Sequence, residues 1–193
     1  MNENIEFLQA FLKSPLKTGA ITPSSPELAQ AMIDGIRPHA GSIVVELGVG
    51  TGSFTKQLRE VVPDEESYLG VEINSKFCRQ LRREFSGLKF ICGDATKLRE
   101  LHKNSDFGKV GYILSGIPFV TLPNEVGDQI LEQVSLFMNE GGCTFRTFQY
   151  AHGYYMPSAL KLRAFMRKRY GRAEKSELII RNVPPAYTLT WRT

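Results

Sequence analysis

The stretch Val44-Val-Glu-Leu-Gly-Val-Gly-Thr-Gly-Ser-Phe-Thr55 decides the fold of this 193-residue chain. It overlaps a short apolar run, Ser42 to Leu47, of the kind that forms a buried parallel strand. Three closely spaced glycines follow, which let the backbone turn sharply and approach a ligand, and the helix that begins next offers free N–H groups to that ligand. This order of strand, glycine-rich turn and helix predicts a loop that binds a nucleotide-like cofactor.

The spacing of the glycines narrows the choice of cofactor. The dinucleotide fingerprint is G-x-G-x-x-G, whereas Gly48, Gly50 and Gly52 stand in the register G-x-G-x-G, with Glu46 before them. The third glycine therefore comes one residue too early, which argues against a nicotinamide cofactor.

Runs typical of buried strands and of amphipathic helices alternate along the rest of the chain. We predict strands at 42–47, 68–73, 88–92, 110–114 and 142–148, and helices at 5–16, 26–37, 75–85, 124–138 and 158–170. Right-handed crossovers would gather these strands into one doubly wound, mostly parallel sheet. The last two apolar runs, 178–181 and 186–191, are too close together for a helical crossover, so we expect an antiparallel hairpin at one edge of a seven-stranded sheet.

Length and composition fit a single α/β domain, which we divide into an N-terminal helical cap at 1–37 and a catalytic core at 40–193. Hydrophobic residues make up 42% of the chain and charged residues 23%, which excludes disordered and low-complexity classes. The longest nearly uncharged stretch, 110–124, is too short to span a membrane, and residues 1–6 do not resemble a secretory signal, so we expect a cytoplasmic protein. The three cysteines and three histidines do not have the spacing of metal ligands, and we expect no metal.

Two carboxylates stand at the predicted ends of the second and third strands. Glu72 lies 20 residues beyond Gly52, where a carboxylate can accept hydrogen bonds from the hydroxyls of a ribose, and Asp94 follows the third strand. The carboxyl ends of parallel strands meet at one edge of a sheet, so both should lie beside the glycine-rich loop.

These three motifs, E-L-G-V-G-T-G, Val71-Glu72 and Gly93-Asp94-Ala95, resemble as a set those of Rossmann-like S-adenosylmethionine-dependent methyltransferases. The resemblance covers about residues 40–150 and implies glycines around the methionine and sugar, Glu72 on the ribose, and Asp94 with Ala95 at the adenine. The cofactor is then S-adenosylmethionine, leaving as S-adenosylhomocysteine. The predicted cofactor-binding residues are Thr18, Gly19, Glu46, Gly48, Gly50, Thr51, Gly52, Glu72, Ile73, Asp94, Ala95 and Ser115.

A fourth motif, Leu114-Ser-Gly-Ile-Pro-Phe119, resembles the N-L-P-Y or N-P-P-Y segment of amino-group methyltransferases, including the ribosomal RNA adenine dimethylases. Gly116 replaces the Asn whose side chain holds the target amine, which puts recognition of a planar base amine in doubt, and Phe119 replaces Tyr. A Phe ring can still face a cationic amine. The predicted catalytic residues are Ser115, Gly116, Pro118, Phe119 and Tyr150.

The flanks, Phe11-Leu-Lys-Ser-Pro-Leu-Lys-Thr-Gly-Ala-Ile-Thr-Pro-Ser-Ser25 and Arg181-Asn-Val-Pro-Pro-Ala186, are similar to those of the bacterial phospholipid N-methyltransferase family. That resemblance implies methylation of phosphatidylethanolamine and its mono- and dimethyl forms, at the inner face of the cytoplasmic membrane. Residues 161–175 hold seven of the 24 basic side chains, beside the apolar stripe Leu162-Phe165-Met166, and suit an anionic membrane surface or an RNA backbone.

An ethanolamine ammonium must lose a proton before it can accept a methyl group. The carbonyls of Ser115 and Gly116 are candidates to orient the amine, and Tyr150, Tyr154 and Tyr155 follow the fifth strand, where a substrate pocket would lie. Three other functions stay open: a nucleic-acid adenine methyltransferase, a methyltransferase that acts on another small amine, and a protein that binds the cofactor or a membrane without catalysis.

Overall fold

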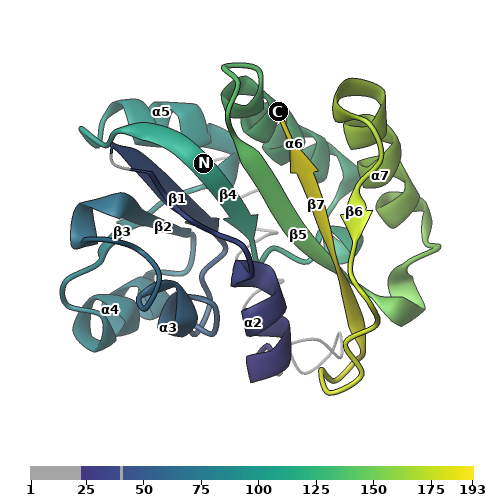
Figure 1. The fold of residues 1–193 in the computed structure, drawn as a ribbon, viewed down its shortest axis with the longest axis horizontal. Coiled ribbons are helices and arrows are strands. Elements are labelled where there is room, and N and C mark those ends of the chain that lie inside the picture. The colour runs from purple at the N-terminus through teal and green to yellow at the C-terminus, as the bar shows by residue number, and fades with distance from the viewer. Residues whose placement is uncertain (1–22, 40) are drawn as a thin grey trace.

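A seven-stranded sheet forms the centre of the molecule, in a computed structural model that describes residues 23–39 and 41–193 (Figure 1). The strand order is β3-β2-β1-β4-β5-β7-β6. The first five strands pair in parallel, and β7 pairs antiparallel with both β5 and β6. The strands are β1 (Ser42–Leu47), β2 (Tyr68–Glu72), β3 (Lys89–Cys92), β4 (Lys109–Ser115), β5 (Thr144–Tyr150), β6 (Glu174–Lys175) and β7 (Ala186–Arg192).

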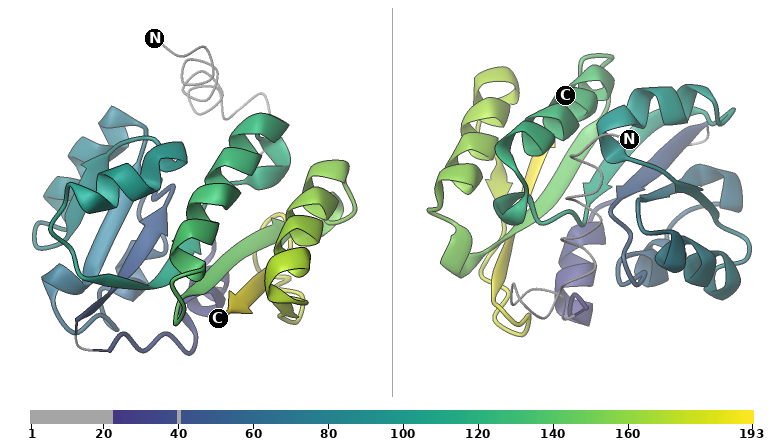
Figure 2. Two further views of the ribbon diagram at one scale, coloured as in Figure 1. Left: turned by 90° about the horizontal axis from the view of Figure 1, so that it is seen from above. Right: turned by 180° about the vertical axis from the view of Figure 1, so that it is seen from behind.

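Helices cover both faces of the sheet, which gives three layers (Figures 1 and 2). One core cluster packs α2, α3 and α4 against the sheet, and the other packs α5, α6 and α7 against the opposite face. The helices are α2 (Pro26–Ile33), α3 (Thr55–Leu58), α4 (Ser75–Glu84), α5 (Leu98–Lys103), α6 (Asn124–Met138) and α7 (Pro157–Tyr170). In the part of the chain that the structure describes, no helix is long and apolar enough to cross a bilayer.

This architecture confirms the predicted α/β class and the seven-stranded, mostly parallel sheet. The predicted hairpin is correct in its second strand and wrong in its first. Residues 178–181 form only an isolated bridge from Ile179 to Ala186, and the two-residue strand β6 lies earlier in the chain. Helix α5 was not predicted, and α2 ends at Ile33 instead of 37. The predicted helix at 5–16 lies outside the described residues.

A buried arginine on β5 holds the C-terminal end of α2. Arg146 is 7% exposed, and its Nη1 donates to the carbonyl oxygens of Met32 at 2.9 Å and Asp34 at 2.7 Å, with a longer contact to that of Ala31. These carbonyls lack partners within the helix, and a cation at this end also suits the helix dipole. Arg146 thereby fixes α2 against the sheet.

The N-terminal end of α2 is tied to the loop before β7. Ser25 caps the helix, accepting from the N–H of Leu28, while its own N–H donates to Oδ1 of Asn182 at 2.9 Å. Asn182 is 2% exposed and also donates to the carbonyl of Pro184 at 2.7 Å. Asn182, in the Arg181-Asn-Val-Pro-Pro-Ala186 motif, therefore joins the loop before β7 to the start of α2.

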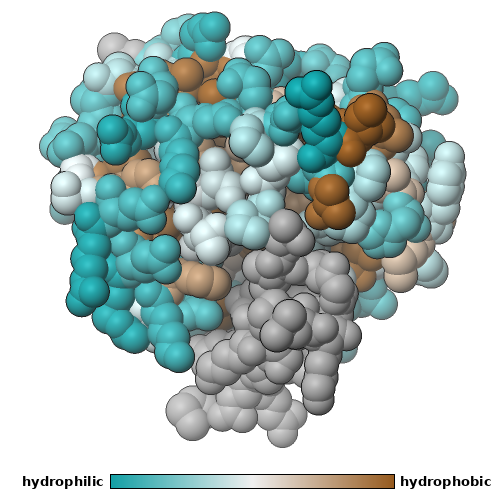
Figure 3. All heavy atoms as spheres, turned by 90° about the horizontal axis from the view of Figure 1, so that it is seen from below, coloured by the Kyte–Doolittle hydropathy of each residue, from teal (hydrophilic) through white to brown (hydrophobic). Residues whose placement is uncertain are grey.

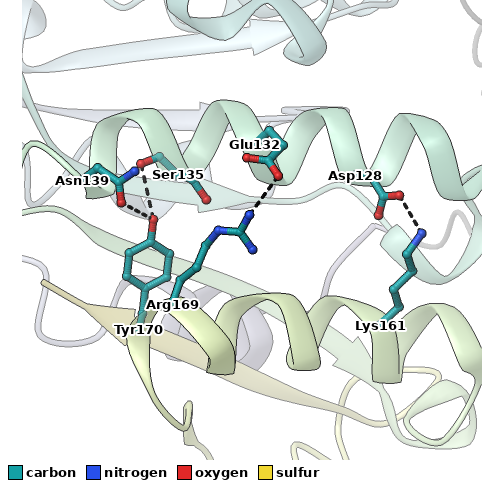
Figure 4. Close-up of polar contacts among 7 residues, drawn as sticks. All are labelled: Asp128, Glu132, Ser135, Asn139, Lys161, Arg169 and Tyr170. Carbon is teal, nitrogen blue, oxygen red and sulfur yellow. Dashed lines mark hydrogen bonds and ion pairs between the residues drawn. The ribbon is translucent and has the colours of Figure 1, made fainter.

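The helices α6 and α7 are joined by polar contacts along one side of α7 (Figure 4). Lys161 pairs with Asp128 at 2.6 Å and Arg169 with Glu132 at 3.0 Å. The apolar stripe of α7 turns inward: Leu162 and Met166 are buried in the core. Packing in the core thus takes up Leu162 and Met166, and the anionic surface or RNA backbone expected for the basic residues beside them stays a prediction.

Candidate functional site

The candidate site, which we call the crevice, lies at the C-terminal ends of β1 and β4, where the order of the strands in the sheet changes direction. Strand β1 pairs with β2 on one side and with β4 on the other, so the chain leaves their C-terminal ends in opposite directions. Ligands of open α/β sheets bind outside the strand ends at this switch point. The loops that follow β1, β2, β3 and β4 therefore line one site, as the sequence predicted.

The glycine-rich loop after β1 needs its glycines for two reasons. Gly48 and Gly52 have φ of +68° and +81°, and a Cβ there would lie 2.6 Å from Cγ1 of Ile117 and 2.7 Å from Cε2 of Phe85. Both positions thus combine a left-handed backbone with close packing. Gly50 also has a positive φ, of +58°, but a Cβ there would meet open space. The loop is anchored at its two outer glycines and open at its middle.

Glu72 joins this loop to the end of β2. Its side chain is almost fully buried, and Oε2 accepts from the N–H of Gly50 at 2.8 Å while Oε1 accepts from the N–H of Asn74 at 2.7 Å. Burial raises the pKa of the Glu72 carboxyl, and these backbone hydrogen bonds act in the opposite direction. Each oxygen keeps a second lone pair, so the carboxylate can also accept from a ligand's hydroxyls.

Asp94 lies at the neighbouring strand end. The N–H of Gly93 donates to the carbonyl of Glu72 at 3.0 Å, which holds the end of β3 against that of β2. One oxygen of Asp94, Oδ1, caps the short 3-10 helix η3 (Ala95–Lys97) by accepting from the N–H of Thr96 at 2.9 Å. Asp94 is partly exposed and Ala95 is buried beneath it. The second carboxylate oxygen remains available to a ligand donor.

Glu46 does not line the crevice, although it was predicted to bind the cofactor. It is fully buried, and its Oε2 accepts from the hydroxyls of Thr55 at 2.8 Å and Tyr68 at 2.7 Å. Desolvation raises the pKa of the Glu46 carboxyl to about 7, against the effect of these two hydrogen bonds. The carboxyl group supports the loop from inside by joining β1 to α3 and β2. Sequence analysis missed Thr55 and Tyr68 as its partners.

The loop after β4 is bound tightly to the loop after β1. The N–H of Gly116 donates to the carbonyl of Leu47 at 2.8 Å, and a Cβ on Gly116 would lie 2.7 Å from the carbonyl oxygen of Gly48. Position 116 is therefore a glycine because the backbones of the loops after β1 and β4 approach each other too closely for a side chain. Ser115 is fully buried, and its carbonyl accepts from the hydroxyl of Thr147 at 3.2 Å. Of the two predicted carbonyls, that of Ser115 is thus already engaged by a hydroxyl of the protein.

Phe119 is a correction to the predicted catalytic set. Pro118 precedes the 3-10 helix η4 (Phe119–Thr121), which carries the ring of Phe119 into the main core cluster, where the residue is 5% exposed. A buried ring packed under α6 cannot face a substrate amine. The motif therefore shapes the turn after β4, and we withdraw the catalytic role of this ring.

A row of aromatic rings runs from the start of α3 to the end of β5. Phe54, at the start of α3, contacts Phe148 edge-on at 6.1 Å between ring centroids, and Phe148 contacts Tyr150 in the same way at 5.3 Å. Tyr150 then stacks on His152 at 5.7 Å. Burial raises the pKa of the Tyr150 hydroxyl. Of this row, sequence analysis selected only Tyr150, because the contacts of Phe54 and Phe148 join segments that are far apart in the chain.

The remaining predicted residues occupy different surroundings. Tyr154 packs against Arg163, whose guanidinium lies 3.8 Å from the ring centroid, and Tyr155 is 80% exposed. Ile73 packs against the core, and Thr51 lies in the glycine-rich loop, partly exposed. Thr18 and Gly19 lie outside the described residues.

Comparisons with known proteins agree with this geometry. A family model described as "Methyltransferase domain" matches residues 44–142, half of the chain. The ornithine lipid N-methyltransferase of Singulisphaera acidiphila is 26% identical over 145 residues, covering 74% of this chain and 76% of that protein. The ribosomal RNA small subunit methyltransferase A of Thiobacillus denitrificans is 32% identical over 97 residues, covering 48% of this chain but 34% of that protein.

The residues of the crevice fit the cofactor of such enzymes. The middle of the glycine-rich loop is open at Gly50, and carboxylates with spare lone pairs follow β2 and β3 at Glu72 and Asp94. A solved S-adenosylmethionine-dependent methyltransferase from Anabaena variabilis shares the fold, with a TM-score of 0.65 at 11% identity, covering 100% of this chain and 95% of that one. The chain therefore belongs to the methyltransferase domain family, as a Rossmann-like methyltransferase whose cofactor is S-adenosylmethionine.

Proposed function

We propose that the protein methylates the amine of a membrane lipid at the inner surface of the cytoplasmic membrane, with phosphatidylethanolamine as the first acceptor to test. One structural observation carries the proposal: apolar side chains stand exposed on the side of the molecule where the crevice opens. The relative named for ornithine lipid N-methylation supports the same class of acceptor.

Two loops supply these exposed side chains. One follows β5 and carries Tyr155 and Met156, and the other precedes β7 and carries Ile180 and Val183, which are 71% and 70% exposed. Tyr150 pairs with Ala186, so the start of β7 and the end of β5 lie at the same edge of the sheet. In Figure 1, β4 and β5 run downward, so Figure 3 looks onto this edge, where hydrophobic spheres lie among hydrophilic ones. Exposed apolar groups of this kind suit a lipid surface.

The chain's own residues would act by positioning and by excluding water. S-adenosylmethionine, when bound, supplies an electrophilic methyl group. Glu72 and Asp94 would hold its nucleoside, and the carbonyl of Gly116 would accept an N–H of the substrate amine and so orient the nitrogen lone pair. Tyr150, which is partly exposed, would face the methylated cation, with the buried rings of Phe54 and Phe148 packed behind it. Water is our candidate to receive the amine proton, because burial raises the pKa of the Tyr150 hydroxyl and keeps that group protonated; the hydroxyl oxygen can accept a hydrogen bond from the amine.

An RNA substrate is the second candidate, because one relative is a ribosomal RNA methyltransferase. The shared 97 residues cover only a third of that relative. The N-L-P-Y segments use an Asn side chain where this chain has Gly116, and no side chain fits there without displacing the carbonyl of Gly48. The lipid substrate is therefore the better supported of the two.

Transfer of labelled methyl groups tests the proposal. The protein is incubated with methyl-labelled S-adenosylmethionine and, in separate reactions, vesicles of phosphatidylethanolamine, vesicles of ornithine lipid, and ribosomal RNA. We expect label in a lipid extract and none in RNA. Glu72→Gln should abolish the label, whereas Glu100→Gln, an equal loss of charge on the exposed face of α5, should preserve it.

Label in RNA alone would replace the lipid proposal by the second candidate. Label in neither substrate, from protein that binds the cofactor, would favour a protein that does not catalyse transfer to these acceptors.

A further inference from the structure

A second hollow lies away from the crevice, between α7 and the edge strands β6 and β7. It has a volume of about 480 Å³, within the range of small-molecule sites. Its floor is apolar and includes Leu189 and Trp191, which are 1% and 2% exposed, and its wall includes Leu160 of α7. None of the residues that line it belongs to the loops after β1 to β4. The hollow is thus a separate feature of the molecule.

One side of α7 forms a wall of the hollow. Leu160, Ala164 and Arg167 are spaced at i, i+4 and i+7, so they share one face of α7, and they span about 10 Å along its axis. Strand β6 has only two residues, so the sheet edge covers little of this face. Apolar walls over such a length suit part of an acyl chain.

Four cationic side chains surround the hollow. Arg163 is occupied, since it donates to Gln149 and to the carbonyl of Tyr154, and Lys175 lies 4.3 Å from the ring centroid of Tyr187. Within residues 23–39 and 41–193, none of the four forms an ion pair, and Arg167 and Arg172 donate no side-chain hydrogen bond. By contrast, Lys161 and Arg169, on the other side of the same helix, each pair with a carboxylate of α6 (Figure 4).

An uncompensated cluster of cations beside an apolar floor calls for an anionic partner with an apolar part. Trp191 lines the same hollow, so a ligand bound there would contact this residue.

We propose that this hollow is a second lipid site, which takes one acyl chain of an acidic phospholipid along α7 and its phosphate group between Arg167 and Arg172. The site is not catalytic. It would select membranes that carry anionic lipid and hold the enzyme on them while the crevice acts on its substrate. The site is separate from the cofactor crevice, because none of its lining residues belongs to the loops after β1 to β4.

The chain offers a direct readout, because Trp191 is its only tryptophan. The full-length protein is titrated, at physiological ionic strength, with dihexanoyl phosphatidylglycerol below the concentration at which it forms micelles, while Trp191 emission is recorded. We expect a saturable change, and none with dihexanoyl phosphatidylcholine or with inorganic phosphate over the same range.

Two matched double variants locate the phosphate. Arg167→Gln/Arg172→Gln should weaken the binding of dihexanoyl phosphatidylglycerol at least about tenfold, since it removes two charge-assisted hydrogen bonds. Lys103→Gln/Lys168→Gln loses the same charge from exposed positions outside the hollow and should bind as the wild type does. Both should still bind S-adenosylhomocysteine, which separates this test from that of the crevice.

Three results would overturn the proposal: no saturable change in Trp191 emission, equal responses to the phosphatidylglycerol and phosphatidylcholine lipids, or equal affinities for the two double variants. A response to inorganic phosphate at the same concentrations would reduce the hollow to a simple anion site and would equally reject the lipid.

Discussion

Gly116 shows how one residue connects two loops of the crevice. Its N–H donates to Leu47, and its Cα faces the carbonyl of Gly48, so the loop after β4 can touch the loop after β1 only if no side chain stands between them. In the sequence, Gly116 stands where the similar N-L-P-Y segments have an Asn that holds the target amine. In the structure, a glycine is required there because any Cβ would be too close to the carbonyl oxygen of Gly48.

We therefore expect Gly116→Ala to lower the free energy of unfolding by about 1–3 kcal/mol, the usual cost of overpacking, and to weaken cofactor binding by displacing the glycine-rich loop. Urea denaturation and calorimetry measure the two effects. Gly127→Ala is the matched control, because a Cβ at that position of α6 would make an ordinary contact with Phe119 at 3.8 Å. It should stabilise the helix by up to about 1 kcal/mol. Equal stabilities of the two variants would refute the role given to Gly116.

Glu46 makes stability depend on pH. Its pKa is about 7 when folded against 4.5 as the ordinary value, so between these values the folded protein holds a proton that the unfolded chain has released. Stability attributable to Glu46 is therefore complete below pH 4.5 and is lost as pH rises to 7 and above, by about 3 kcal/mol.

Glu46→Gln cannot ionise, and should gain stability relative to the wild type across this interval. Urea denaturation of both proteins from pH 4.5 to pH 8 measures the difference. A difference that does not change with pH would contradict the buried, protonated carboxyl.

Among the elements, α2 depends most on a distant residue. Arg146 meets its last carbonyls from more than 100 positions along the chain. Arg146→Met fills similar space but donates nothing, so we expect a loss of about 2–4 kcal/mol in unfolding free energy and faster amide exchange in α2. Arg169→Gln, which breaks an exposed pair with Glu132, should cost no more than about 1 kcal/mol. Unchanged exchange in α2 of Arg146→Met would show that other contacts hold this helix.

The difference between local sequence patterns and contacts of distant segments explains which features the sequence could predict. The strand, the glycine turn and the carboxylates at the strand ends follow from local patterns and from the rule that parallel strands end at one edge, so Glu72 and Asp94 could be placed in advance. The contacts of Arg146 could not, since they join segments that only the tertiary fold brings together. Phe119 was misplaced because the short turn after Pro118, and not the motif, sets the direction of its ring.

The molecule as a whole carries a formal net charge of +4 and presents Ile180 and Val183 beside the crevice. If the strand-end side meets the membrane, Ile180→Ser/Val183→Ser should reduce cosedimentation with phosphatidylethanolamine and phosphatidylglycerol vesicles severalfold. Leu136→Ser is the control, because Leu136 is also exposed but lies near the opposite end of α6, toward the start of β5. Equal losses in the two proteins would mean that another face binds the vesicles.

The proposed function depends on one crevice that holds S-adenosylmethionine against Glu72 and Asp94. Titration calorimetry with S-adenosylhomocysteine, the unreactive product, tests this most directly. We predict that the wild type and Glu100→Gln bind one equivalent with equal affinity, and that Glu72→Gln and Asp94→Asn each bind at least about tenfold more weakly. Folded wild-type protein that takes up no ligand, or variants that bind it as tightly as the wild type, would contradict the account.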